Sequence, residues 1–329
     1  MSEFRKDPVV DRWVIISTEK TPINYTNTTA EEKIEECPFC EGNESATPTE
    51  ILSYRDQKTK PNEKGWWIRV IPNKYPILKV EEPFMKKGEG LYDKITGVGA
   101  HEIIIETPSH LNDIFKLDDK QMEDVLSVYR DRIMDLKKDI RFEYIMIFKN
   151  KGKKAGANIN HSHSHLIALP IIPKRINEEL LGASKYFSYK ERCVFCDIIE
   201  EELRVNKRIV YENDDFVAFC PYAARSPFEI WIMPKQHESH FFNIKKSQIS
   251  SCAKALKTVL EKLSKATGGA DYNYILHDSP IKETNFAHYH WHIEIIPRIT
   301  NIAGFERGTG FYINPVSPEI SAEYLRNLE

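Results

Sequence analysis

One pattern of potential metal ligands occurs twice in this sequence and constrains the fold more than any other feature. Each copy contains a Cys-x-x-Cys pair, then a lone histidine, then three histidines at alternate positions. In both copies 51 positions separate the lone histidine, His110 or His237, from the first histidine of the triplet, His161 or His288. A unit of this length that is present only twice indicates a duplicated domain rather than a repeat array.

Each copy of the pattern supplies two cysteines and two histidines, the set that a closed tetrahedral zinc site uses. We therefore predict two structural zinc ions per chain, one in each half. The expected ligands are Cys37, Cys40, His110 and His161 in the first half and Cys193, Cys196, His237 and His288 in the second. A redox-active Cys-x-x-Cys is the alternative, but it would not require a histidine at the same distance downstream in both halves.

The segments between the motifs predict the same order of strands and one helix in each half. β-Branched and aromatic runs indicate strands at 66–71, 101–106, 144–148 and 161–169, and helical periodicity spans 117–138. The second half repeats this order at 209–211, 216–219, 229–232, 247–266 (the helix), 272–276 and 290–296. We predict an α+β fold of two tandem domains, 1–175 and 190–329, each an antiparallel sheet with helices packed on it. Residues 173–191 are expected to join the halves, and the polar residues 41–64 to form a loop.

Composition excludes several classes of protein. The chain has 329 residues, of which 41% are hydrophobic, and its 46 basic and 49 acidic residues give a net charge of −3. This balance argues against a nucleic-acid or membrane surface. The N-terminus lacks an apolar signal core, and no window reaches the roughly 18 apolar residues of a membrane span. We therefore expect a cytoplasmic protein, in which Cys-x-x-Cys pairs favour metal over disulfide.

The first triplet and the loop before it indicate phosphate chemistry. Side chains at alternate positions of a strand face the same way, so a metal can hold His161 while the next imidazoles, His163 and His165, stay free. Upstream, Gly152 and Gly156 permit a tight turn whose backbone N–H groups suit a phosphate. A glycine pair alone more often forms a surface turn, but its place before three aligned histidines favours the functional interpretation. The second half lacks such a loop, so catalysis is assigned to the first half.

Short motifs follow one another along nearly the whole chain: Asp7-Pro8, Cys37-Pro-Phe-Cys40, Asn73-Lys-Tyr-Pro76, Asn150-Lys-Gly152, His161-x-His163 and residues 303–314. Their order resembles the galactose-1-phosphate uridylyltransferase family, which belongs to the histidine-triad superfamily. The resemblance implies two histidine-triad-type domains in a homodimer. It also implies a ping-pong transfer of UMP from UDP-glucose to galactose 1-phosphate, with His163 as the nucleophile that carries the nucleotide. The metal ligands implied for the first site are the same four residues.

The resemblance further implies which residues hold the nucleotide sugar and the sugar 1-phosphate. We expect the side chains of Asn150 and Asn158, with backbone N–H groups near Gly156, to hold phosphate oxygens. A backbone carbonyl of Asn160 or a neighbour would fix the tautomer of His163. The other expected substrate contacts are Asn73, Phe305 and Glu306.

Two positions depart from the family pattern and keep other functions open. Members of the family carry arginines after the first strand, whereas this chain offers only Lys20 there. They also carry glutamine as the third member of the triplet, whereas this chain has His165. Histidine at that place is typical of histidine-triad hydrolases, so His165 is a second catalytic candidate. The alternatives are therefore an ADP-glucose phosphorylase, a nucleotide-sugar hydrolase and, outside catalysis, a zinc-stabilised nucleotide-binding module.

Overall fold

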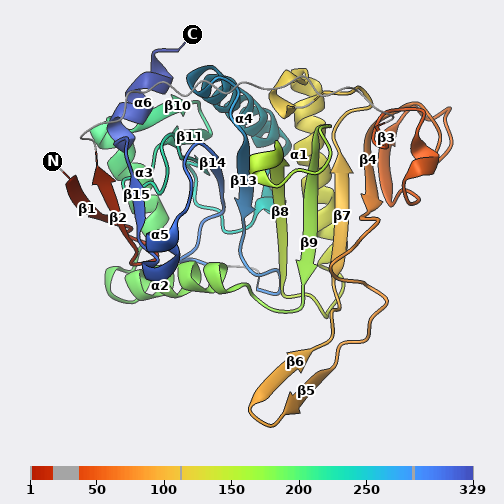
Figure 1. The fold of residues 1–329 in the computed structure, drawn as a ribbon, viewed down its shortest axis with the longest axis horizontal. Helices are drawn as coiled ribbons and strands as arrows, with labels where there is room; N and C mark the ends of the chain where they lie inside the picture. Colours follow the sequence, from red (N-terminus) through yellow and green to blue (C-terminus); the bar gives the residue numbers. More distant parts are fainter. Residues whose placement is uncertain (1, 18–36, 112, 284–285, 329) are drawn as a thin grey trace.

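The computed structural model describes residues 2–17, 37–111, 113–283 and 286–328, and one ten-stranded sheet dominates it (Figure 1). The strands lie in the order β10-β11-β12-β14-β13-β8-β9-β7-β4-β3, and every neighbouring pair is antiparallel. The N-terminal half contributes β3 (Leu52–Arg55), β4 (Trp66–Pro72), β7 (Ala100–Ile105), β8 (Tyr144–Lys151) and β9 (His163–Leu169). The C-terminal half contributes β10 (Ile209–Glu212), β11 (Phe216–Phe219), β12 (Ile230–Pro234), β13 (Tyr272–His277) and β14 (His292–Pro297).

The two halves of the sheet have the same topology. In each, the first three strands lie side by side in chain order, the fifth strand pairs with the third, and the fourth strand lies innermost. The halves meet where β13 pairs with β8, with Ile275 opposite Phe148. The predicted α+β fold of two similar antiparallel sheets is thus confirmed, but the two sheets are continuous.

Helices cover both faces of the sheet. The two helices that connect third to fourth strands, α1 (Asp119–Leu136) and α4 (Lys246–Thr267), pack on one face and share a core with both half-sheets. Local capping residues set where these helices begin and end. The Asp118 side chain accepts a hydrogen bond from the Gln121 N–H and caps the start of α1, and Gly268 ends α4 in a left-handed conformation. The opposite face of the C-terminal half is covered by α2 (Lys174–Lys190) and α3 (Val194–Val205).

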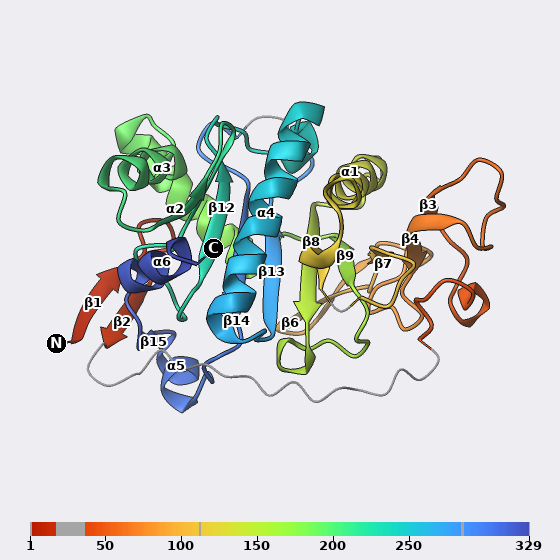
Figure 2. The same ribbon diagram turned by 90° about the horizontal axis from the view of Figure 1, so that it is seen from above.

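The first and last described elements, β1 (Ser2–Lys6) and α6 (Pro318–Arg326), both pack on the C-terminal half, where Arg5 forms an ion pair with Glu319 (Figures 1 and 2). β1 and β2 (Trp13–Ser17) form a small sheet with β15 (Tyr312–Asn314), which follows α5 (Gly304–Thr309) and precedes α6. Residues 2–17 therefore belong in space with the C-terminal half, although the expected N-terminal domain began at residue 1. The hairpin β5 (Lys86–Glu89) and β6 (Tyr92–Ile95) projects away from the sheet.

One expectation about the connecting segments is wrong. Residues 41–64 contain β3 and the 3-10 turn η1 (Glu44–Ala46), because pairing with β4 orders a segment that has no periodicity of its own. Residues 173–191, the expected join, contain the 17-residue helix α2, which connects the two halves. Among the described residues, no helix is long and apolar enough to cross a membrane.

Candidate active site and metal centres

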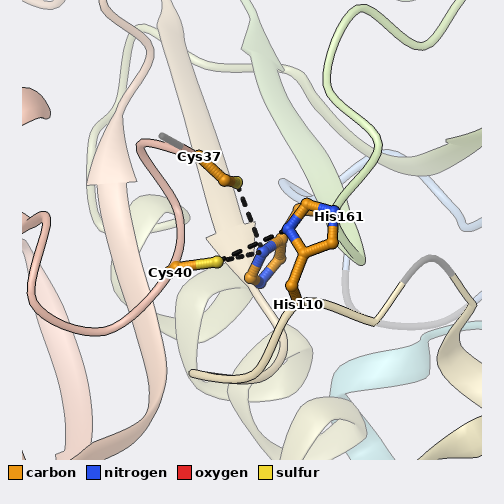
Figure 3. Close-up of side chains that lie close together, drawn as sticks. All are labelled: Cys37, Cys40, His110 and His161. Atoms are coloured by element: carbon orange, nitrogen blue, oxygen red, sulfur yellow. Dashed lines mark hydrogen bonds between the residues drawn. The ribbon is translucent and has the colours of Figure 1, made fainter. Parts of the chain in front are cut away.

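The first predicted metal set converges in the N-terminal half (Figure 3). Cys37 and Cys40 come from the turn after the N-terminal segment, His110 follows β7, and His161 immediately precedes β9. The Sγ of Cys40 lies 3.4 Å from Nδ1 of His110 and 3.6 Å from Nδ1 of His161, and the Sγ of Cys37 lies 3.5 Å from the latter. Sulfur and nitrogen ligands of a tetrahedral zinc ion stand ~3.5 Å apart, given Zn–S and Zn–N bonds of ~2.3 and ~2.0 Å.

The outer contacts of this set also fit a metal. The Nε2 of His161 lies 2.8 Å from the carbonyl oxygen of Thr107, so Nε2–H can donate there while Nδ1 faces the two sulfurs. Histidines that bind zinc usually donate their second ring N–H in this way. The donor atoms and their surroundings therefore suit a closed zinc site.

The second metal set differs from the prediction in one ligand. Cys193, Cys196 and His237 converge as expected, but the fourth residue is His290 rather than His288. The Sγ of Cys196 lies 3.3 Å from Nδ1 of His237 and 3.6 Å from Nδ1 of His290, whose Nε2 lies 2.9 Å from the Pro234 carbonyl. The ring of His288 instead packs near Phe286 and Phe187.

Strand register explains the error. The histidine that joins the candidate metal set stands two residues before the fifth strand in each half: His161 before β9, which begins at His163, and His290 before β14, which begins at His292. From His237 to His290 is 53 positions rather than 51, so matching the two triplets by spacing shifts the second one by two residues. The counterpart of His163 is thus His292, and the counterpart of His165 is Glu294.

His163 occupies the place expected of the nucleophile. Its Nδ1 lies 2.6 Å from the His161 carbonyl oxygen, which holds a proton on Nδ1 and leaves the lone pair on Nε2. The expected carbonyl contact is therefore present, one residue beyond Asn160. Burial, followed by the nearby charge of Lys149, lowers the pKa of His163 to about 4, so the imidazole is neutral. The ring of Phe39, from the Cys-x-x-Cys turn, packs edge-on at 5.2 Å.

His165 joins a chain of side chains that the motifs did not predict. Its Nδ1 lies 3.3 Å from Nε2 of His101 on β7, and the same nitrogen of His101 lies 3.1 Å from Nδ2 of Asn73. The imidazole of His165 also stacks on Phe148 at 5.0 Å with an angle of 7° between the rings. Burial, with the neighbouring His163 and His101, lowers the pKa of His165 to about 3. Asn73 is thus linked to the triplet through His101, which has no motif of its own.

A fully buried ion pair supports the strand from its other face. Nζ of Lys149 lies 2.5 Å from the Glu106 carboxylate and donates to the carbonyl oxygen of His163 at 3.0 Å. Ser162 and Ser164, the residues between the histidines, donate to the same carboxylate. The Lys149 charge holds the pKa of Glu106 below its usual value, although burial alone would raise it. Sequence reasoning missed this pair because each partner lies in an ordinary strand-like run.

The glycine loop differs from the prediction in its chemistry. The N–H of Gly156 donates to the Lys153 carbonyl at 3.0 Å, within the 3-10 turn η3 (Lys153–Ala155), and is therefore committed to the turn rather than to a phosphate. Asn150 accepts a hydrogen bond from Asn273 at 2.6 Å, and Asn158 is exposed. Gly152, with φ of 85°, is required because a Cβ there would lie 1.9 Å from an Asp271 oxygen. The loop is therefore anchored to the C-terminal half.

Two expected substrate contacts lie elsewhere in the chain. Phe305 and Glu306 are on α5, which stands beside β15 and apart from β9 in both ribbon views. Phe305 is 45% exposed, so it is open to contact with another molecule. Lys20 lies outside the described residues.

A further group of ligand-type residues surrounds His292. Glu179 from α2, His277, His292 and Glu294 have donor atoms within 4.8 Å of one another, all buried. His277 lies 3.1 Å from the Glu179 carboxylate and 3.3 Å from that of Glu294. Burial by itself would lower the pKa of His277, but the two carboxylates raise it to about 9. Arg175 and Arg225 also bind Glu294, so protonated side chains already balance these carboxylates.

Comparisons with known proteins agree with this geometry. Residues 1–173 match the family model described as galactose-1-phosphate uridyl transferase, N-terminal domain, and residues 179–327 match its C-terminal domain. ADP-glucose phosphorylase of Arabidopsis thaliana is 36% identical over 335 residues, which cover 99% of this chain and 93% of the relative. Galactose-1-phosphate uridylyltransferase of Thermotoga maritima is 32% identical over 340 residues, which cover 100% and 99%. The A. thaliana phosphorylase structure with bound ADP-glucose has a TM-score of 0.83 at 34% identity and full coverage of both chains.

Proposed function

Because this chain belongs to the galactose-1-phosphate uridylyltransferase family, we propose that it moves UMP from UDP-glucose to galactose 1-phosphate in carbohydrate metabolism. The observation that carries this proposal is the environment of His163. Its ring is neutral, its Nδ1 is tied to the His161 carbonyl, and it stands beside a metal set that engages its neighbour instead. These features suit a nucleophile that forms a covalent nucleotide intermediate.

The proposed reaction has two displacements on the same phosphorus atom. Nε2 of His163 attacks the α-phosphorus of the nucleotide sugar, the bond to the bridging oxygen breaks, and sugar 1-phosphate leaves. The nucleotidyl imidazole keeps its Nδ1 proton, which the His161 carbonyl stabilises as positive charge develops on the ring. A phosphate oxygen of the acceptor then attacks, the bond to Nε2 breaks, and neutral His163 is restored.

The other residues of the site would bind and orient the substrates. We assign the phosphate oxygens to Asn150 and Asn158, with Gly156 shaping the loop rather than donating its N–H. His165 would donate a hydrogen bond to the leaving phosphate through Nε2, because Nδ1 faces His101. Zinc, bound by the two Cys2His2 sets, would supply structural cross-links between distant segments, and no step of the reaction needs it.

A nucleotide-sugar phosphorylase is the second candidate function. It is favoured by the 36% identity to a relative named ADP-glucose phosphorylase. Both reactions share the covalent step at His163 and differ in the nucleobase and in the acceptor. In the phosphorylase reaction, inorganic phosphate would attack the nucleotidyl imidazole and carry the nucleotide away as a diphosphate.

One set of assays separates these candidates. UDP-glucose and ADP-glucose would each be incubated with the enzyme and with galactose 1-phosphate, inorganic phosphate or no acceptor, and glucose 1-phosphate release would be measured. We expect release with UDP-glucose and galactose 1-phosphate, and a labelled phosphohistidine on the peptide that contains His163. Preference for ADP-glucose with inorganic phosphate would establish the phosphorylase. Release without acceptor would establish a hydrolase, and nucleotide binding without release or label would leave only the binding module.

We further propose a cytoplasmic homodimer. Phe305 and Glu306 lie on α5, which stands apart from β9 in both ribbon views, so a second copy of the chain would bring them to the substrate at His163. Light scattering should give twice the chain mass. Mixed dimers of His163→Asn with a Phe305→Ala, Glu306→Ala chain should then recover activity that neither variant has alone, and no recovery would exclude these residues from the partner's site.

A further inference from the structure

A chain of hydrogen bonds crosses from the C-terminal half into the N-terminal half and ends at Asn150. Nε of Arg298, which directly follows β14, donates to Oδ1 of Asn273 on β13. Nδ2 of Asn273 donates to Oδ1 of Asn150 on β8 at 2.6 Å and to the carbonyl oxygen of Ala155 at 2.9 Å. The chain of bonds therefore crosses the junction of β13 with β8, where the two half-sheets meet.

The donor-only and acceptor-only groups in this chain fix the direction of every bond. A guanidinium can only donate, so the Asn273 atom that faces Arg298 is the amide oxygen. A carbonyl oxygen can only accept, so the Asn273 atom that faces Ala155 is the amide nitrogen. Both contacts require the same orientation of the Asn273 amide, and that orientation makes Asn150 accept through its oxygen. The NH2 group of Asn150 is therefore left for another acceptor.

This NH2 group lies on the face of the sheet that carries the proposed nucleophile. Strands β8 and β9 pair Phe148 with His165, and the same register continued by two residues sets Asn150 beside His163. Nδ2 of Asn150 has no hydrogen-bond partner among the described residues, and the side chain is only partly buried. A Cβ added to Gly156 would lie 3.7 Å from this nitrogen and would be the sole close contact, so there is space beside it. A free donor with space beside it suits a phosphate oxygen.

Arg298 brings a positive charge that no carboxylate balances. In the described part of the chain it forms no ion pair, and its side chain donates to Asn273 alone. Burial, followed by the nearby charge of Arg225, lowers the pKa of Arg298, but an arginine stays protonated at neutral pH. A fixed cation at the start of a hydrogen-bond chain polarises the amides that follow, so it strengthens Asn150 as a donor.

We propose that Asn273 and Arg298 are positioning residues of the active site, which orient the Asn150 amide so that its NH2 group binds a phosphate oxygen of the substrate. Both act through Asn150, because β8 lies between β13 and the catalytic strand β9. The inference rests on the proposed nucleotidyl transfer at His163. It gives the C-terminal half a part in that reaction, although this half has no nucleophile of its own.

Two substitutions of Asn273 test the orientation. In Asn273→Asp a carboxylate faces both neighbours, so Asn150 must turn its nitrogen inward and present its oxygen to the phosphate. In Asn273→Leu the Asn150 amide is free to rotate. We expect kcat/KM for nucleotide transfer to fall by about tenfold in Asn273→Leu and by at least about 100-fold in Asn273→Asp. A side chain that only supports the fold gives the reverse order, because aspartate matches asparagine in shape, and that order would overturn the proposal.

A double-mutant cycle tests whether Arg298 acts through Asn150. We expect Arg298→Met to lower kcat/KM by about tenfold in the wild-type background and by less than about twofold in Asn150→Ala. Arg298→Lys keeps a donor and the charge, so it should restore most of the loss. Arg204→Met, which removes an exposed arginine paired with Glu201, is the control for the loss of one positive charge. Equal losses in both backgrounds would refute positioning through Asn150.

Ligand binding keeps this inference separate from the proposed reaction and does not depend on turnover. UDP, ADP, uridine and adenosine would be titrated into wild type and Asn273→Asp, with urea unfolding of both proteins measured in parallel. We expect Asn273→Asp to weaken diphosphate binding by at least about tenfold and nucleoside binding by less than about twofold. Absence of a covalent label at His163 in wild type would contradict the proposed transfer. Equal diphosphate affinities of the two proteins would instead contradict the positioning role.

Discussion

The three histidines of the first triplet share one side chain but lie in three different hydrogen-bond environments, which suit them to different roles. His161 donates from Nε2 to the Thr107 carbonyl and so directs Nδ1 to the cysteines. His163 has the opposite arrangement, with Nδ1 on a carbonyl and the Nε2 lone pair available. His165 is held through Nδ1 by His101 and by stacking on Phe148. A tautomer fixed by one backbone oxygen therefore separates a candidate metal ligand from the proposed nucleophile two residues away.

Replacing the proposed nucleophile, and separately its counterpart His292, should show which half of the molecule carries the covalent step. We expect His163→Asn to lower kcat by at least about 10⁴-fold and to abolish covalent labelling, because the proposed intermediate forms on Nε2 of this imidazole. His292→Asn, the same change at the structural counterpart, should keep the label on His163. Labelling with radioactive nucleotide sugar, quantified per folded chain, measures this. Loss of label in His292→Asn alone would mean that the catalytic half is misassigned.

The lowered pKa of His165 changes the effect that we expect from replacing it with glutamine. An ordinary histidine would make hydrolysis of the nucleotide intermediate rise with pH near 6.5, but a pKa of about 3 leaves His165 neutral throughout the neutral range. We therefore expect the intermediate to decay without acceptor at a rate that is flat between about pH 5 and 8. His165→Gln should preserve transfer and change that decay by less than about threefold. A step in the decay rate near pH 6.5 that disappears in His165→Gln would instead support the hydrolase.

At the scale of single elements, the first residue of the fifth strand determines which histidine joins each candidate metal set. The strand in each half begins two residues after the ligand, so His290 and not His288 belongs to the second site. We expect wild-type protein to bind about two zinc ions, His290→Ala about one, and His288→Ala about two. Elemental analysis after dialysis measures the count. Equal zinc loss in both variants would contradict the register.

The stability of the strands around His163 should depend on the buried ion pair between Lys149 and Glu106. Lys149→Met leaves the Glu106 carboxylate buried without a counterion, so we expect it to lower the free energy of unfolding by about 3–5 kcal/mol. Adding Glu106→Gln should restore at least half of that loss, because the uncompensated charge is removed. Lys257→Met, which breaks the exposed pair with Asp119, should change stability by less than about 1 kcal/mol. Urea unfolding distinguishes these outcomes, and a double variant no more stable than Lys149→Met would exclude the charge explanation.

At the scale of the whole molecule, α2 connects the halves and meets the C-terminal sheet through a network of buried charges. His277 on β13 bridges Glu179 of α2 and Glu294 of β14. Its raised pKa means that the folded state binds a proton more tightly than the unfolded chain. The stabilisation is therefore complete below the unfolded pKa of about 6.5 and is lost as pH rises through about 9.

This linkage predicts a pH dependence of stability. Between pH 6.5 and 9.5 the wild-type protein should lose up to about 3 kcal/mol of unfolding free energy through this group. His277→Gln should be less stable at pH 6.5 and should lack that part of the decline. Urea unfolding of both proteins at the two pH values, with zinc content checked, measures the difference. Parallel declines would show that His277 carries no extra proton in the folded state.

The sequence alone determined the duplication, the fold class, seven of the eight proposed zinc ligands and the position of His163. These follow from local patterns: ligand spacing, strand and helix periodicity, and short motifs that remain readable without a structure. Tertiary structure decided the rest, because it depends on strand pairing between distant segments. Register selected His290, pairing across the sheet brought His101 to His165, and burial on opposite strands joined Lys149 to Glu106. The buried charges and a cavity of the C-terminal half likewise arise only when α2, α3 and the N-terminal segment pack on the second sheet.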